Sequence, residues 1–160
     1  MEYWYIENVE VLERYCPGGF HPITIGDHLC GPYRIVHKLG FGSYSTVWLA
    51  RDERADRYVA IKIAVAERTG KSQENTIIRL LRDKVHPCKD FIPPILDEFF
   101  LTGPNGKHQC TVTVPASISI AVAITGPRNF FQLAATRAIA AQLILAISFL
   151  HSQGIVHGGK

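Results

Sequence analysis

A glycine-rich turn followed by a strand that ends in one lysine is the part of this sequence that could do chemistry. Gly40 and Gly42 lie within residues 39–50, and Lys62 ends the apolar run 59–62. Glycine lets backbone N–H groups come close to an anion, because no Cβ stands in the way. A lysine at the end of an apolar strand adds a single ammonium at a fixed place. Together they predict a site that holds phosphate groups.

Spacing excludes two other phosphate-binding motifs. A dinucleotide-binding loop continues into a helix and has an acidic residue about twenty positions on, whereas here a strand follows and Val59 and Ala60 occupy that region. Residues 70–72 (Gly-Lys-Ser) look like the end of a Walker A loop, but that motif needs glycine where Val65 stands. The glycine pair alone is weak evidence, since any tight hairpin can contain it, and Ser45 replaces a third glycine.

The elements that would position these residues are strands first and helices later. Alternating or apolar runs predict strands, and residues 103–106 carry a strong turn signal. A short helical pattern with an apolar face (Ile77, Ile78, Leu80 and Leu81) covers residues 70–83, and a longer one covers 133–151, with Gly154 as its stop. The expected strands are residues 33–39, 46–50, 58–65, 95–101 and 109–114. This order predicts an α+β fold, a five-stranded antiparallel lobe followed by the start of a helical one.

Composition limits the function classes. The 160 residues are 47% hydrophobic and 19% charged with a formal net charge of +3, which is typical of a globular domain. Lys and Arg are scattered, so no nucleic-acid track is expected. The four cysteines lie far apart without a C-x-x-C pair, which favours free thiols in a reducing compartment. The apolar stretch 138–150 is interrupted by Gln142 and lies close to Arg137, so no membrane span is expected. We expect an intracellular protein, cytoplasmic and/or nuclear.

Residues 15–27 (YCPGGFHPITIGD) and 40–50 (GFGSYSTVWLA) closely resemble the SR-protein kinases, in particular the divergent fungal members of that family. The resemblance covers roughly residues 15–158, and Ser45 supports it because the family typically has serine there. It implies a protein-kinase-like small lobe, namely a five-stranded antiparallel sheet with an αC helix. The implied boundaries are 1–32 for an N-terminal extension with the lead-in motif, 33–116 for the N-lobe and hinge, and 117–160 for a truncated start of the C-lobe.

The resemblance also implies an ATP site. Lys62 would reach the α- and β-phosphates and pair with Glu74, because a buried lysine needs such a partner to stay charged. A solvated acid on a helix face is the alternative for Glu74, and plain core packing is the alternative for the apolar residues. In this site Thr113 would be the gatekeeper, and the Val114 carbonyl and Ala116 N–H would read the adenine edge. The other implied nucleotide-binding residues are Leu39, Val47 and Ala60 around adenine, Phe41, Gly42, Ser43 and Tyr44 over the phosphates, and Gly40 and Ser45 in the same hairpin.

Near residue 157 the resemblance implies a catalytic loop. His157 would be structural, and Gly159 stands where the family has the aspartate that accepts the proton of the substrate hydroxyl. The asparagine and the D-F-G aspartate that hold Mg²⁺ are not among the 160 residues, so Mg²⁺ is expected only in an intact kinase. If an intron interrupts an aspartate codon after its first G and is read through, the result is Gly159 and Lys160. A genuine short isoform or a degenerate gene is the alternative.

The sequence therefore predicts the ATP-binding part of a serine/threonine protein kinase whose substrates are Arg/Ser-rich splicing factors. As a truncated chain it is expected to be inactive, and the apolar helix 133–151 is expected to fold back, self-associate or aggregate. A non-catalytic, pseudokinase-like nucleotide-binding or interaction module is the alternative. No direct nucleic-acid or membrane partner is expected.

Overall fold

The computed structural model describes residues 9–71, 73–117, 120, 123 and 131–156. The chain divides into two compact units, which are described one at a time. The first consists of Met1–Ser72 and Ile95–Pro115, and the second of Gln73–Pro94 and Ala116–Lys160.

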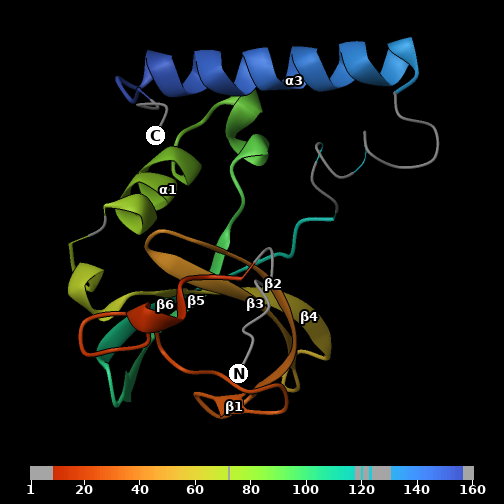
Figure 1. The fold of residues 1–160 in the computed structure, drawn as a ribbon. Coiled ribbons are helices and arrows are strands. Elements are labelled where there is room, and N and C mark those ends of the chain that lie inside the picture. The colour runs from red at the N-terminus through yellow and green to blue at the C-terminus, as the bar shows by residue number, and fades with distance from the viewer. Residues whose placement is uncertain (1–8, 72, 118–119, 121–122, 124–130, 157–160) are drawn as a thin grey trace. The chain divides into compact units, whose positions relative to one another are not determined.

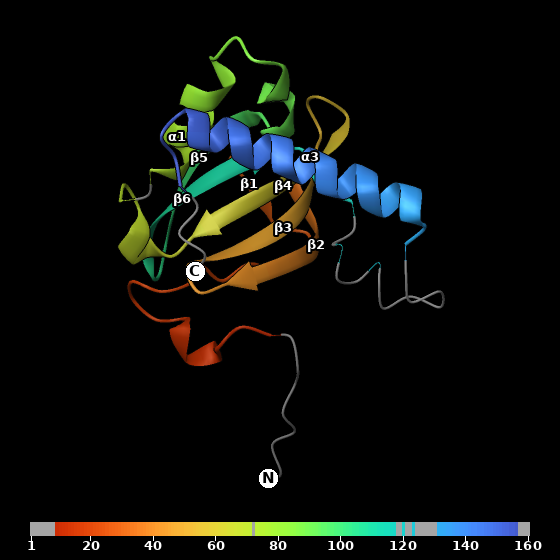
Figure 2. The same cartoon turned by 90° about the horizontal axis from the view of Figure 1, so that it is seen from above.

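A six-stranded antiparallel sheet forms the body of the first unit (Figure 1). Its strands lie in the order β1-β2-β3-β4-β6-β5, and the neighbouring strands β2, β3 and β4 are seen side by side in Figure 2. The five predicted strands are confirmed, and most extend farther than predicted. The sixth, β1, has only two residues, too few to show an alternating pattern. The strands are β1 (His28–Leu29), β2 (Tyr33–Gly42), β3 (Ser45–Asp52), β4 (Arg57–Ala64), β5 (Ile95–Gly103) and β6 (Gly106–Thr113).

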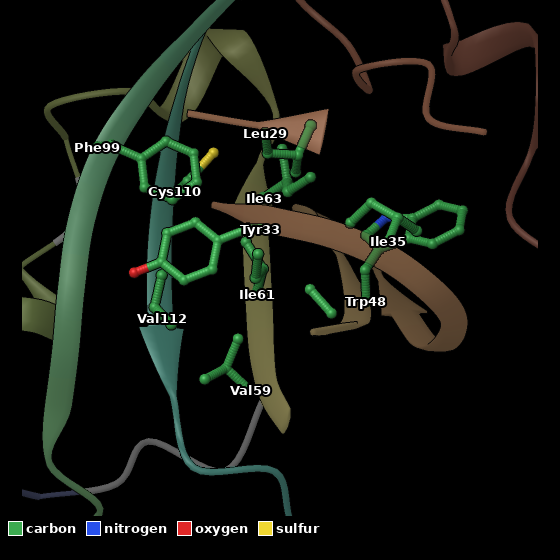
Figure 3. Close-up of a cluster of buried hydrophobic side chains, with 11 residues drawn as sticks. Leu29, Tyr33, Ile35, Trp48, Val59, Ile61, Ile63, Phe99, Cys110 and Val112 are labelled. Atoms are coloured by element: carbon green, nitrogen blue, oxygen red, sulfur yellow. The ribbon is translucent and has the colours of Figure 1, made fainter. Parts of the chain in front are cut away.

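One face of this sheet covers a hydrophobic core. Burial alternates along β3, so that every second residue from Thr46 onward is buried, as expected for a strand with one covered face. The Tyr33 ring stacks on Phe99 with 5.6 Å between centroids, and its hydroxyl donates to the Asp97 carboxylate at 2.7 Å. Figure 3 shows the core residues: Leu29, Tyr33, Ile35, Trp48, Ala50, Val59, Ile61, Ile63, Phe99, Cys110 and Val112.

The lead-in segment, residues 9–27, packs against the sheet of the first unit. It contains one 3₁₀ turn, η1 (Leu12–Arg14), and then a loop that follows the glycine pair Gly18 and Gly19. The Asn105 carbonyl, in the β5–β6 turn, accepts the Gly18 N–H at 2.8 Å, and its side-chain amide donates to the Phe20 carbonyl at 2.6 Å. The lead-in is thus joined to the sheet by backbone hydrogen bonds and by a buried asparagine.

A buried carboxylate fixes the beginning of the lead-in. The Glu10 side chain is only 4% exposed, accepts hydrogen bonds from the Lys38 ammonium and the Tyr15 hydroxyl, and forms an ion pair with Lys38. Burial acts to raise the pKa of Glu10, but the bonds from Lys38 and Tyr15 stabilise the carboxylate more, so the pKa lies below its ordinary value.

The second unit contains α1 (Glu74–Arg82), the 3₁₀ helix η3 (Pro87–Phe91) and α3 (Leu133–Ser152). Its small core consists of Leu81, Cys88 and Phe149, with the His86 ring stacked on Phe149 at 4.4 Å between centroids. Both predicted helices are confirmed, but the apolar face predicted for the first is wrong at Leu80, which is 47% exposed. Gly154 ends α3 as predicted, with a φ of 72°.

The long helix α3 leaves most of its apolar side chains uncovered. Phe149 is its one buried residue within the described part of the chain. By length and composition alone α3 could cross a membrane, a property that it shares with core helices of soluble proteins. The stretch 138–150 predicted no membrane span. The finding differs because the helix, with 20 residues, is longer than that stretch. The exposed large apolar residues of α3 are Leu133, Leu143, Ile144, Leu145 and Ile147.

The lowered pKa of Glu10 predicts how the first unit responds to acid. A group whose pKa is lowered by folding contributes stability above its unfolded pKa, and that contribution is lost as pH falls through the folded pKa. We expect Glu10→Gln to lower the free energy of unfolding at pH 7 by about 1–3 kcal/mol, and to make stability less dependent on pH below about pH 5. Urea unfolding at a series of pH values measures both effects.

The matched control is Glu13→Gln, which removes an exposed carboxylate from the same segment. It should leave both the stability and its pH dependence unchanged. Stability curves for Glu10→Gln and the wild type that run parallel below pH 5 would contradict the assignment of this pH dependence to Glu10.

Candidate functional site

Several of the predicted site residues lie on the face of the sheet opposite to the core. Along β3, Trp48 is buried in the core, so Val47 points to the other face, because side chains alternate along a strand. The register pairs Val47 with Gly40 on β2 and with Lys62 on β4. Thr111 on β6 pairs with Lys62 and extends the row. Four strands thus bring the glycine hairpin and the lysine to one face.

A second row lies two residues along the same face. Leu49 on β3 pairs with Ala60 on β4, and Ala60 pairs with Thr113, the last residue of β6. The predicted adenine-enclosing Ala60 and the predicted gatekeeper Thr113 are therefore cross-strand neighbours. Leu49 was not among the predicted residues, although the two-residue period from Val47 would have indicated it.

Space is open above the glycine positions of the hairpin. Gly42 pairs with Ser45, and Ser43 and Tyr44 form the two-residue tip between β2 and β3. A Cβ built on Gly40 or on Gly42 meets no atom of the described chain within 4 Å. No neighbouring atom of the described chain therefore requires glycine at these two positions. The open space is consistent with a ligand that binds close to the backbone there.

Two predicted residues of the hairpin contribute differently from the rest. A register shift between Lys38 and Gly40 leaves Leu39 at a bulge, where it is 44% exposed. Phe41 pairs with the buried Thr46, so its side chain lies on the core side of the hairpin, with its ring 5.8 Å from the Lys38 ammonium. Of Phe41, only the backbone can face the site.

The remaining predicted residues are not all in the first unit. Glu74 is the first residue of α1 in the second unit, and its pairing with Lys62 stays a prediction. Val114 follows β6 and is exposed, and Ala116 is the first residue after the first unit ends at Pro115. His157 and Gly159 lie outside the described residues.

Sequence reasoning missed the residues behind the hairpin tip. Arg14, in the lead-in, donates a hydrogen bond to the Ser43 carbonyl, although the two are 29 positions apart. The Arg68 guanidinium lies over the Tyr44 ring, 4.1 Å from its centroid. No sequence signal links these pairs, because they come from loops and 3₁₀ turns without periodicity. Thr111 could have been found, since it lies two positions before Thr113 on the same strand.

Comparison with known families identifies this arrangement. Residues 33–158 match the model of the protein kinase domain. The chain belongs to the protein kinase family. The match includes the glycine hairpin, Lys62 and Glu74, and it agrees with the predicted α+β fold.

Curated relatives narrow the resemblance. A serine/threonine protein kinase of Aspergillus fumigatus is 34% identical over 152 residues, which cover 92% of this chain and 38% of the relative. Protein kinase dsk1 of Schizosaccharomyces pombe is 35% identical over 157 residues, which cover 92% of this chain and 29% of the relative. SRSF protein kinase 3 of Homo sapiens is 40% identical over 113 residues, which cover 66% of this chain and 20% of the relative. The predicted resemblance to SR-protein kinases is confirmed, and the chain spans well under half the length of these relatives.

Protein kinases in general use ATP and Mg²⁺. The first unit fits the nucleotide, because the open space above Gly40 and Gly42 and the Lys62 side chain lie on one face. Among the residues that the structure describes, no group of three or more His, Cys, Asp or Glu side chains could hold a metal ion.

Substitution by alanine should affect ATP binding at one glycine of the first unit and stability at another. Gly40→Ala should change the free energy of unfolding by less than about 0.5 kcal/mol and weaken ATP binding, because its methyl group would occupy the open face. Gly19→Ala should destabilise by about 1–3 kcal/mol, because its Cβ would lie 1.9 Å from the Arg14 carbonyl oxygen. Urea unfolding and calorimetric ATP titration measure the two effects. If Gly40→Ala unfolded at a lower urea concentration than the wild type, the fold itself would need this glycine.

Proposed function

We propose that this chain is the ATP-binding part of a serine/threonine protein kinase. The observation that carries the proposal is the row formed by Gly40, Val47 and Lys62 on one face of the sheet. An ammonium beside a glycine hairpin with open space above it suits a polyphosphate, because the hairpin offers backbone N–H donors and the lysine offers a charge.

The proposed roles follow the positions on the sheet. Lys62 contacts the α- and β-phosphates, and Glu74 keeps its ammonium charged and oriented. Val47 and Ala60 pack against adenine with Leu39, while Thr113 limits the depth of the pocket. The backbone of Val114 and Ala116 forms hydrogen bonds with the adenine edge.

We propose further that a kinase containing this lobe phosphorylates serines of Arg/Ser-rich proteins. The support is the similarity to SRSF protein kinase 3, whose name gives its substrate class. The 160-residue polypeptide is proposed to bind ATP without transferring phosphate, since Gly159 offers no carboxylate to accept the proton of a substrate hydroxyl. Its intracellular location stays a prediction.

Lysine substitution tests the nucleotide site. Lys62→Met should weaken ATP binding about tenfold or more, because it removes a charge-assisted contact to phosphate. The control Lys107→Met removes an exposed lysine from the same sheet, on β6, where its ammonium lies 4.3 Å from the centre of the Phe100 ring. It should bind ATP as the wild type does. Calorimetric titration with ATP distinguishes the variants, and equal affinities for Lys62→Met and the wild type would refute the assigned site.

Phosphate transfer to an Arg/Ser-repeat peptide tests the substrate class. A kinase that contains this lobe should incorporate phosphate into such a peptide and not into a matched peptide with alanine for every serine. It should act poorly on a serine peptide without arginine. ATP binding by the same protein with no transfer to either serine peptide would favour the non-catalytic nucleotide-binding module instead.

A further inference from the structure

A single arginine of the lead-in connects three segments behind the glycine hairpin. One terminal nitrogen of Arg14 donates to the Ser43 carbonyl at the hairpin tip. The other donates to the Glu67 carboxylate at 3.2 Å, and the guanidinium lies over the Phe20 ring at 5.0 Å from its centroid. Because guanidinium is planar with donors on two sides, it can serve both acceptors at once, which an ammonium on a flexible stem does less well.

The backbone fixes the place from which Arg14 reaches the tip. Its carbonyl accepts the Phe20 N–H at 2.8 Å, and a Cβ on Gly19 would lie only 1.9 Å from that carbonyl oxygen. The Ala66 and Glu67 N–H groups donate to the carbonyls of Gly19 and Gly18 at 3.1 and 2.9 Å. The lead-in and the 3₁₀ turn η2 (Ala66–Arg68) therefore form one hydrogen-bonded base.

A groove lies between this base and the core side of the hairpin. An open groove of about 330 Å³ separates the two, with Phe20 on the lead-in and Phe41 on the hairpin among the residues that line it. Apolar packing across this groove is thus incomplete, and the bond from Arg14 bridges it. The other tip carbonyl, of Tyr44, accepts the Val65 N–H at 3.0 Å.

Peptide geometry links this bond to the nucleotide face. In a planar trans peptide the C=O and the following N–H point in opposite directions, and the described chain contains no cis peptide. Arg14 holds the Ser43 C=O toward the lead-in, on the side of Phe41. The N–H of Tyr44 is therefore directed to the other side of the hairpin, the side on which Val47 and Lys62 lie.

We propose that Arg14 is a positioning residue for phosphate binding. By holding the Ser43 carbonyl it orients the Tyr44 N–H toward the phosphates and limits the movement of the hairpin tip. The proposal rests on the proposed ATP site and adds to it a residue outside the nucleotide face. The role of Arg14 concerns the phosphates and not adenine, since the hairpin tip, Ser43 and Tyr44, is separate from the adenine-enclosing Leu39, Val47 and Ala60.

Comparing two ligands separates this role from simple stabilisation. Arg14→Ala should weaken ATP binding about tenfold while adenosine, which has no phosphates, binds within about twofold of wild type. Deuterium uptake of a peptide that covers residues 40–45 should also become faster. The control Arg34→Ala removes an exposed arginine of the same sheet, paired with Glu53 at 3.3 Å, and should change none of these measurements.

Each other outcome has a definite meaning. If Arg14→Ala weakens the binding of ATP and of adenosine equally, Arg14 does not position the phosphates. The same conclusion follows if it changes the binding of neither ligand. If the wild type binds neither ligand, the proposed ATP site fails, and deuterium uptake alone decides whether Arg14 restrains the tip. Unchanged uptake at residues 40–45 would then overturn the proposal, and faster uptake would support the restraint.

Discussion

The side-chain alternation along β3 and β4 is the constraint on which the rest of the first unit depends. Trp48 and Ile61 face the core, and as a result Val47 and Lys62 face the opposite side. A slip of one residue in the register would bury the lysine and expose the core. Packing of the hydrophobic core therefore fixes the position of the charged group, because the two faces belong to the same strands.

The lead-in extends this constraint to the hairpin tip. A tip of two residues at the end of two strands has few neighbours of its own, so its position depends on what holds it from behind. Here Arg14 and Val65 bind the two tip carbonyls. The ion pair between the buried Glu10 and the partly exposed Lys38 fixes the start of the same segment on β2. Removal of one partner from such a pair leaves the other buried without compensation, so the pair holds the two segments in a defined geometry.

The second unit shows a different balance. Its core is small, and α3 exposes several leucine and isoleucine side chains. At roughly 25 cal/mol per Å² of apolar surface, covering such a face would contribute substantially to the stability of a domain. Residues 133–151 lie within the match to the protein kinase domain, and the expectation that a larger lobe surrounds this helix stays a prediction.

Much of the fold and part of the site could be predicted from the sequence. The strands around the glycine hairpin, the turn at residues 103–106 and the stop at Gly154 follow from local signals, and so does the place of Lys62 near the end of an apolar strand. The two-residue β1 and the exposure of Leu80 could not be predicted, because a short strand has no period and helix burial depends on what packs against each side.

The sequence by itself determined which residues could do the chemistry, because glycine turns, a lone lysine and strand alternation are local properties of the chain. Only the tertiary structure decided which of them share a face and what holds them there. The register joins Gly40, Val47 and Lys62 in one row, and the contact of Arg14 with Ser43 closes a loop of 29 positions. Such contacts depend on how distant segments pack, and no local pattern encodes them.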